Sequence, residues 1–154
     1  MLPGGQPYVQ YTQLGQYGPA AVLNLATVPQ QQQACLDASE SADSYMRGRY
    51  PLPLLSAGAD IVRHTAYVAW YLLINTIGYA PQAGSDANIS GNYYLAMGYP
   101  DRPGSGFFPG IQAQRVHPDV TVSPPVGSDQ GHDAPQVHSL PMRGWQQGNR
   151  VGGM

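Results

Sequence analysis

Small and apolar residues recur every three or four positions between residues 29 and 49, and this spacing places them on one face of a helix. The positions on that face are Ala34, Ala38, Ala42, Tyr45 and Arg49, with Met46 beside them. Because the face is built mainly of alanine, we expect another element to pack closely against it. Asp43 precedes Arg47 by four residues, an orientation that favours an ion pair on the helix surface.

A second helix is predicted from about residue 56 to residue 77, where nearly every position is apolar. A helix that is apolar all round is buried on all sides, so this one should be the centre of the fold. The third predicted helix covers residues 87–97, and its apolar side contains Ile89, Tyr93, Tyr94 and Met97.

The N-terminal part of the chain is less regular. Residues 1–11 are mainly Gly, Gln, Pro and Tyr without a period, which predicts an extended N-terminal arm. The helical core is expected over residues 12–98, and it opens with a turn at Thr12 and a short helix after Pro19, since proline is favoured in a first helical turn.

After Gly98 the helical period is lost. Residues 99–154 are predicted to form an extended, Pro/Gly-rich C-terminal arm, in which weak alternation over residues 111–122 could give a short β-hairpin. From residue 123 onward the chain has little to bury, and taken alone it should be disordered. The predicted fold is therefore mainly α: a small bundle of one short N-terminal helix and three further helices, the second long and buried, with two extended arms.

Composition changes the expected function more than the expected fold. The chain has 19 glycines and 15 prolines among 154 residues, no lysine, and only 10% charged residues, against roughly 25% in an ordinary soluble protein. Interfaces are depleted in Lys and Glu and enriched in Tyr and Arg, so the composition favours a protein that works in contact with others. A net charge of -2 argues against electrostatic capture of nucleic acid, which needs clustered basic residues.

Targeting and catalytic signals are weak. The first residues lack the basic and apolar regions of a secretory signal, and the most apolar run, residues 66–74, is shorter than the roughly 20 residues that a bilayer requires. The single cysteine, Cys35, excludes an intrachain disulfide. We expect no enzyme activity, cofactor or metal, because neither the spacing of the histidines nor a set such as Ser39, Asp60 and His64 matches a known arrangement.

Several residues are instead candidates for an assembly interface. Arg47 and Arg49 flank a glycine at a helix end, where they could bind a partner's carboxylates or cap the helix themselves. Trp145 lies in a tail without a core of its own, so we expect it to insert into a pocket of a neighbour. The remaining candidates are Tyr45, Tyr50, Leu140 and Met142.

Residues 34–54 carry the pattern Ala-Ser-x-x-x-Asp-Ser-Tyr-x-x-Gly-Arg-Tyr-x-Leu-Pro-Leu, which begins at Ala38 and precedes the long apolar helix. This run resembles the signature of a family of tailed-bacteriophage head-to-tail connector, or adaptor, proteins typified by a Mu-like virion protein. The similarity covers about residues 8–98. The third helix is shorter and richer in glycine than is usual in that family, and the tail after Gly98 is long.

The resemblance implies a subunit of a homo-oligomeric ring, expected to be a dodecamer, below the portal protein. Such a ring would join the capsid to tail or neck proteins and would let double-stranded DNA pass through its bore without specific contacts. We therefore expect the protein in the virion neck, after synthesis in the host cytoplasm, with no membrane partner.

Two other functions fit part of the pattern. A tail-completion or capsid-decoration protein would share the composition but not the Gly-Arg-Tyr-Pro-Leu-Pro-Leu run. A DNA-packaging accessory module would need a basic stripe, and the sequence contains none.

Overall fold

The computed structural model describes residues 1–78 and 84–123, with the side chains of the third long helix described from residue 87. A compact unit covers Met1–Pro124. Its elements are the 3₁₀ helices η1 (Pro3–Gly5) and η2 (Tyr11–Gln16), the helices α1 (Ala20–Leu23), α2 (Val28–Met46), α3 (Ala59–Ile77), α4 (Gly84–Met97) and α5 (Phe107–Gln112), and the strands β1 (Leu54–Ala57) and β2 (Val120–Val122). The expected mainly α bundle is confirmed.

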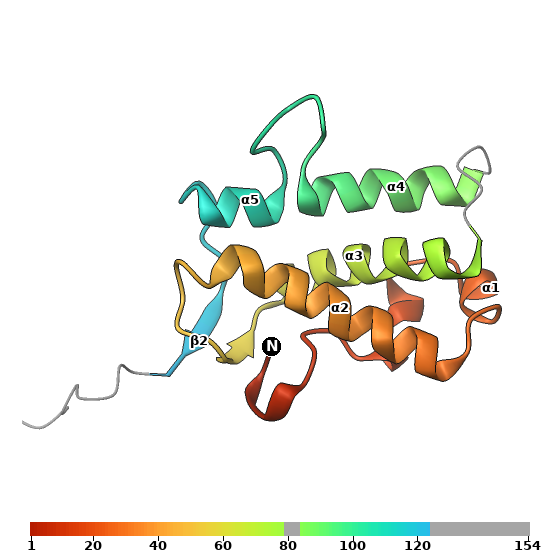
Figure 1. Cartoon of the computed structure of the whole chain (residues 1–154), viewed down its shortest axis with the longest axis horizontal. Coiled ribbons are helices and arrows are strands. Elements are labelled where there is room, and N and C mark those ends of the chain that lie inside the picture. Colours follow the sequence, from red (N-terminus) through yellow and green to blue (C-terminus); the bar gives the residue numbers. More distant parts are fainter. Residues whose placement is uncertain (79–83, 124–154) are drawn as a thin grey trace, which may run out of the picture. The chain divides into compact units, whose positions relative to one another are not determined.

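Helix α3 is the centre of the bundle. It packs against α2 on one side and against α4 on the other, while α5 continues beyond the end of α4 and also contacts α2 (Figure 1). Its largest buried side chains include Ile61, Trp70, Leu73 and Ile74. Arg63 near its start and Asn75 and Thr76 near its end are exposed, so the helix is not enclosed along its whole length.

Helix α2 forms where the alanine period predicts it. Its start is capped by Thr27, whose hydroxyl oxygen accepts the Gln30 N–H while the Gln30 side chain accepts the Thr27 N–H at 2.8 Å. Ala38, Ala42 and Met46 are fully buried, so the predicted close-packed face is confirmed. The predicted surface pair of Asp43 with Arg47 is wrong, because Asp43 is buried and accepts hydrogen bonds from the N-terminal segment.

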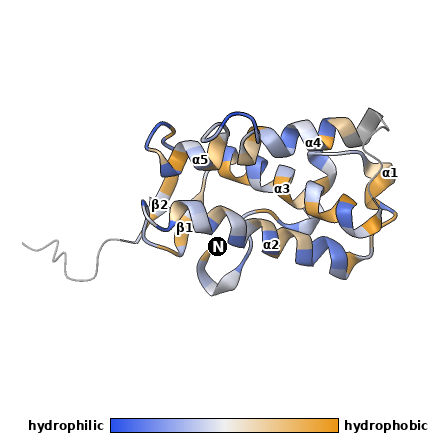
Figure 2. Cartoon of the chain, turned by 45° about the horizontal axis from the view of Figure 1, so that its top comes forward, coloured by the Kyte–Doolittle hydropathy of each residue, from blue (hydrophilic) through white to orange (hydrophobic). Residues whose placement is uncertain are grey.

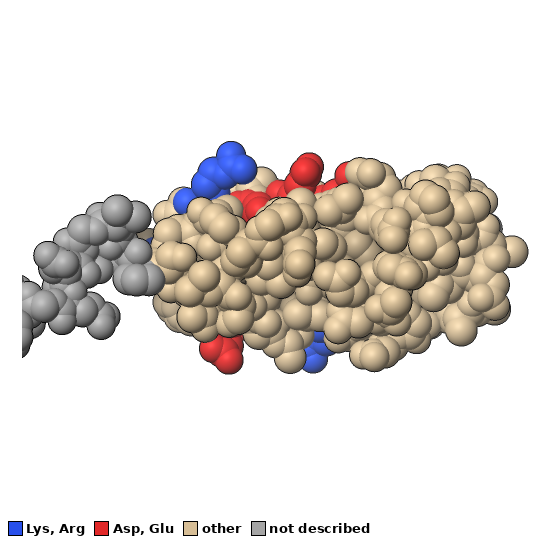
Figure 3. Space-filling model, turned by 90° about the horizontal axis from the view of Figure 1, so that it is seen from below, with Lys and Arg blue, Asp and Glu red and all other residues tan. Residues whose placement is uncertain are grey.

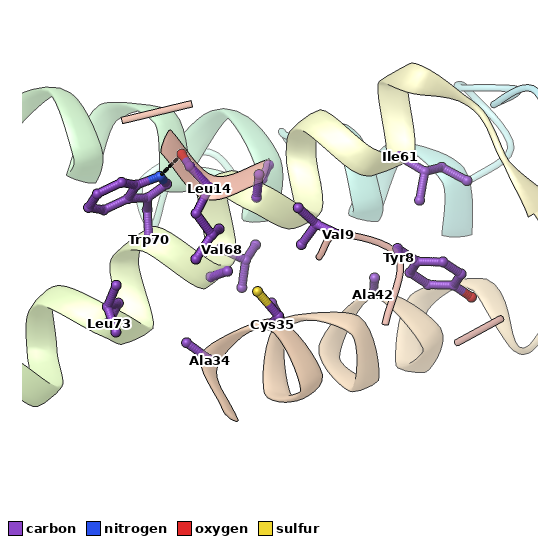
Figure 4. Packing of buried hydrophobic residues seen from close by; sticks show 14 of the residues in the cluster. Tyr8, Val9, Leu14, Ala34, Cys35, Ala42, Ile61, Val68, Trp70 and Leu73 are labelled. Atoms are coloured by element: carbon purple, nitrogen blue, oxygen red, sulfur yellow. Dashed lines mark hydrogen bonds between the residues drawn. The ribbon is translucent and has the colours of Figure 1, made fainter. Parts of the chain in front are cut away.

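The structure packs part of the expected N-terminal arm, residues 1–11, against the bundle. Tyr8 and Val9 are buried, and the Tyr8 N–H donates to the Ser39 hydroxyl on α2 at 3.0 Å. Leu14 of η2 is buried beside Trp70, whose indole N–H donates to the Leu14 carbonyl at 2.9 Å, as Figure 4 shows. These side chains lack a helical period but still complete the core, which therefore begins before the expected boundary at residue 12.

The expected hairpin over residues 111–122 is also corrected. Strand β2 pairs antiparallel with β1, with Leu54 opposite Val122 and Ala57 opposite Val120. The first half of the expected hairpin instead overlaps the end of α5 and the turn after it, and Phe108 and Ile111 of this helix are fully buried three residues apart. A helical turn buries both side chains against the bundle, whereas a strand of that alternation would place them on opposite faces.

Three candidate residues, Leu140, Met142 and Trp145, lie outside the described residues, as does most of the predicted C-terminal arm. Within the described part, hydrophobic residues also reach the surface at α1 and the start of α2, where Leu25 is 73% and Val28 is 47% exposed (Figure 2).

Candidate assembly surface

The candidate residues at the end of α2 have three different environments. Tyr45 is half-buried, and its ring stacks with that of Phe108 on α5 at a centroid distance of 6.4 Å. Arg47 is exposed and directly follows the last residue of the helix, where its N–H donates to the Asp43 carbonyl at 2.8 Å. Arg49 and Tyr50 are half-buried, and the Arg49 Nε atom is buried without a hydrogen-bond partner in the described structure.

Tyr45 lines an open groove of about 730 Å³, which we call the tyrosine groove. Its other aromatic walls come from Tyr93 and Tyr94 on α4 and from Tyr99 in the following loop. The rest of its lining is Met97, Gly98, Pro100, Pro103, Gly104, Pro109, Gln112 and Ala113, so no charged residue lines it. Such a surface favours apolar and hydrogen-bonding partners over ions.

The tyrosine rings of the groove form a continuous row. Tyr71 on α3 stacks on Tyr93 with centroids 3.9 Å apart, Tyr93 meets Tyr94 edge to face at 5.7 Å, and Tyr94 stacks on Tyr99 at 5.3 Å. Burial among these rings raises the pKa of Tyr93. The row is anchored in the bundle at one end and reaches the 39%-exposed Tyr99 at the other, so the groove presents rings that are already held in position.

The loop of residues 98–106 holds one wall of the groove, and its two ends meet. Gly98 and Gly106 both have φ 96°, and a Cβ on Gly98 would collide with the Ser105 carbonyl oxygen. The Ser105 hydroxyl accepts the Tyr99 N–H at 2.8 Å, and the Arg115 guanidinium donates to the Gly104 carbonyl. Compact loops whose ends are this close frequently carry function.

Sequence reasoning identified Tyr45 but missed the contribution of this loop. Tyr99, Pro100 and Pro103 lie in a stretch without a hydrophobic period, which was assigned to the C-terminal arm. The available signal was the pair of glycines that flank two Pro-containing turns, since glycine is the residue that allows a positive φ and a close backbone approach.

A polar cluster under α2 is structural. The Asp43 carboxylate accepts hydrogen bonds from the Tyr8 hydroxyl and from the Met1 amino group, the latter at 2.6 Å. Burial raises the pKa of the Tyr8 hydroxyl. Burial lowers the pKa of the Met1 amine, and this effect exceeds the opposing one of the neighbouring Asp43 carboxylate. The cluster fixes the N-terminal segment rather than forming an open site.

The residues that could resemble a nucleophilic set also serve the packing. The Ser39 hydroxyl donates to the Cys35 carbonyl at 2.8 Å, and burial raises the pKa of the Cys35 thiol to about 12. His64 stacks on Phe107 at 4.0 Å, its Nδ1 lies 2.7 Å from the Asp60 carbonyl oxygen, and burial lowers its pKa. In the described part of the chain, these three side chains do not converge on a cavity.

The rest of the described surface is poor in charge. Figure 3 shows a face on which charged side chains occupy only small areas. Within residues 1–78 and 84–123, no group of three His, Cys, Asp or Glu side chains could hold a metal ion. None of the helices described is both long enough and apolar enough to cross a membrane.

Comparison with known proteins gives two matches. Residues 8–99 match the family described as bacteriophage Mu, Gp36. A Mu-like prophage FluMu protein gp36 from Haemophilus influenzae is 50% identical over 42 residues, which are 27% of this chain and 30% of that protein. This chain therefore covers less than a third of the length of that relative. No solved structure matches the chain significantly.

Proposed function

The chain belongs to the bacteriophage Mu Gp36 family, and from this premise we propose that it is a virion structural protein, the subunit of a head-to-tail connector. In this proposal several copies form a ring below the portal protein, extend the DNA channel and join the capsid to the tail or neck. The proposal includes no catalytic step. The role of the protein is mechanical, because buried interface area and interlaced segments of neighbouring copies hold the capsid and the tail together.

The observation that carries the proposal is the tyrosine groove in a chain of phage origin. A protein that works alone rarely exposes large apolar surfaces, and those it does expose are often binding sites. Here Tyr99 is 39% exposed, and the half-buried Tyr45, Tyr93 and Tyr94 line the same groove. Tyrosine is the side chain that interfaces favour, because its ring buries area and its hydroxyl still bonds.

The low charge supports the second part of the proposal, passage of DNA. A protein that grips DNA neutralises phosphates with many Lys and Arg side chains. The described arginines, Arg47, Arg49, Arg63, Arg102 and Arg115, are spread over several elements, and Arg102 is paired with Asp101 at 3.8 Å. A bore built from such a chain would bind DNA weakly and let it slide.

The proposal is tested by making virus particles without this chain. We expect heads that package DNA but fail to join tails or to keep the DNA, together with free tails, in negative-stain electron micrographs. Normal, infectious particles in the same preparation would contradict the connector role. Defective tails on stable, filled heads would instead favour a tail-completion protein.

A further inference from the structure

We propose that the tyrosine groove of one copy binds residues 134–145 of the C-terminal segment of a second copy of this chain. This inference rests on the proposed function, because it requires neighbouring copies in one assembly. It assigns an occupant to a surface that the folded unit leaves open.

The groove has the chemistry of a site for an extended, proline-containing segment. Grooves lined by aromatic rings bind such segments in several domain families, because the segment is already extended and loses little entropy on binding. Tyr94 and Tyr99 stack 5.3 Å apart and both line the groove, and Pro103 and Pro109 add apolar surface to its wall. The lining contains no charge that an apolar segment would have to desolvate.

Residues 134–145 match that chemistry. The segment reads Ala-Pro-Gln-Val-His-Ser-Leu-Pro-Met-Arg-Gly-Trp, with its prolines at positions 135 and 141. Between Asp133 and Arg143 it contains no Asp, Glu, Lys or Arg. Leu140, Met142 and Trp145 supply large apolar side chains, and a Trp is the residue most often found as an interface anchor.

The chain between the two parts sets how far the segment can reach from the folded unit. Residues 124–133 join the folded unit to the segment, and ten extended residues span about 35 Å. Ten residues of this kind also keep the segment at a high effective concentration near adjacent subunits.

The contact of a tail on one copy with a groove on the next is heterologous, and heterologous contacts generate rings when the rotation closes. A tail bound to its own groove would leave copies unlinked. The exchange between copies is therefore the arrangement that serves the proposed joint.

The test places a photo-crosslinking phenylalanine analogue at position 145 of the full chain. Isotopically light and heavy copies are mixed before irradiation, and the linked peptides are identified by mass spectrometry. We expect light–heavy links from position 145 to peptides that contain Tyr94, Tyr99 or Pro103. The same analogue at position 128, outside the segment, is the matched control and should give few links to the groove.

Two pairs of variants separate binding from folding. Tyr99→Ala should reduce the yield of groove links about tenfold, as loss of an aromatic anchor does, whereas Leu95→Ala, at an exposed position outside the groove, should leave it unchanged. Replacing Leu140 and Met142 with serine changes no described residue and should give the same loss as Tyr99→Ala.

Native mass spectrometry of the same samples distinguishes the possible failures. Oligomers whose links avoid the groove would overturn this inference and leave the connector role standing. Links that stay within one copy, or a yield unaffected by Tyr99→Ala, would also overturn it. The connector role itself is tested separately, by the assembly of particles that lack the chain.

Discussion

Asp43 shows how a single residue ties the N-terminal segment to the bundle. It is the buried acceptor for the Tyr8 hydroxyl and the Met1 amino group, which approach α2 from a part of the chain more than 30 residues away. A buried polar group that loses its hydrogen-bond partner costs more free energy than the hydrogen bond contributes when it is formed. Asp43 therefore stabilises a contact that the helix pattern does not reveal.

Replacing this residue tests its role. Asp43→Ala should lower the free energy of unfolding by about 2–3 kcal/mol, because two donors lose a charged, buried acceptor, as measured by urea denaturation. Asp37→Ala on the exposed face of the same helix is the control and should change it by less than about 0.5 kcal/mol. Equal effects of the two variants would show that the N-terminal segment is not held by Asp43.

His64 gives a prediction for the dependence of stability on pH. Burial lowers its pKa in the folded chain, so below the ordinary value of 6.5 the unfolded chain binds the proton more readily than the folded one. The free energy of unfolding should therefore decrease as the pH falls from about 7 to 5. His64→Phe preserves the stack on Phe107 and should flatten this dependence; an unchanged slope in denaturation at several pH values would refute it.

At the scale of elements, the loop of residues 98–106 sets the shape of the tyrosine groove. Its ends approach so closely that only glycine fits at Gly98, and its internal hydrogen bonds carry Tyr99 to the end of the ring row. One wall of the groove is thus a loop without regular secondary structure, which joins α4 to α5.

The variant Gly98→Ala should open this loop. The added methyl group meets the Ser105 carbonyl at a backbone conformation that alanine avoids, so we expect a loss of about 1–3 kcal/mol in the free energy of unfolding. Gly48→Ala meets no atom and is the matched control. If thermal and urea denaturation show no difference between the two variants, the loop does not depend on this close approach.

The elements that the sequence predicts are those with a local period. Helices α2 and α4 follow from spacings of three and four residues and α3 from its nearly continuous apolar run, while Thr27 and Pro29 mark the start of α2 and Gly78 the end of α3. The pairing of Leu54 with Val122 joins strands over 60 residues apart, and no local pattern encodes it. The burial of Tyr8 and Val9 likewise depends on a surface that exists only after α2 and α3 have packed.

The tyrosine groove was also only partly predictable from the sequence. Tyr45 lies on a helical face with a clear period and is a candidate from the sequence, whereas Tyr99 and Pro103 belong to a loop whose position is set by two glycines and an Arg115 hydrogen bond. Turn-rich segments with few charges can thus be folded parts of a site, and glycine spacing is the signal to examine in them.

At the scale of the whole molecule, the chain combines a compact unit, Met1–Pro124, with a segment that supplies proline, leucine, methionine and tryptophan. Few charges and many tyrosines lower the cost of bringing copies together, because little ionic hydration is lost at their interfaces. The compact unit therefore has open surfaces, and the segment has apolar side chains of the kind that we propose to bind there.

Deleting residues 124–154 separates the two parts. The described core side chains all lie before this cut, so the shortened chain should retain its far-ultraviolet circular dichroism and its unfolding midpoint. Particles that carry it should lose DNA, because the copies are no longer linked through their tails. Filled heads that remain joined to tails would contradict the proposed latch.

The most direct measurement of the central claim is a cryo-electron microscopy reconstruction of the neck of virus particles that contain this chain. The account predicts a closed ring of copies between the portal and the tail, with the α2–α3–α4 bundle of each copy resolved around a DNA-sized bore. A neck without this bundle, or the bundle bound to the outer capsid shell, would contradict it.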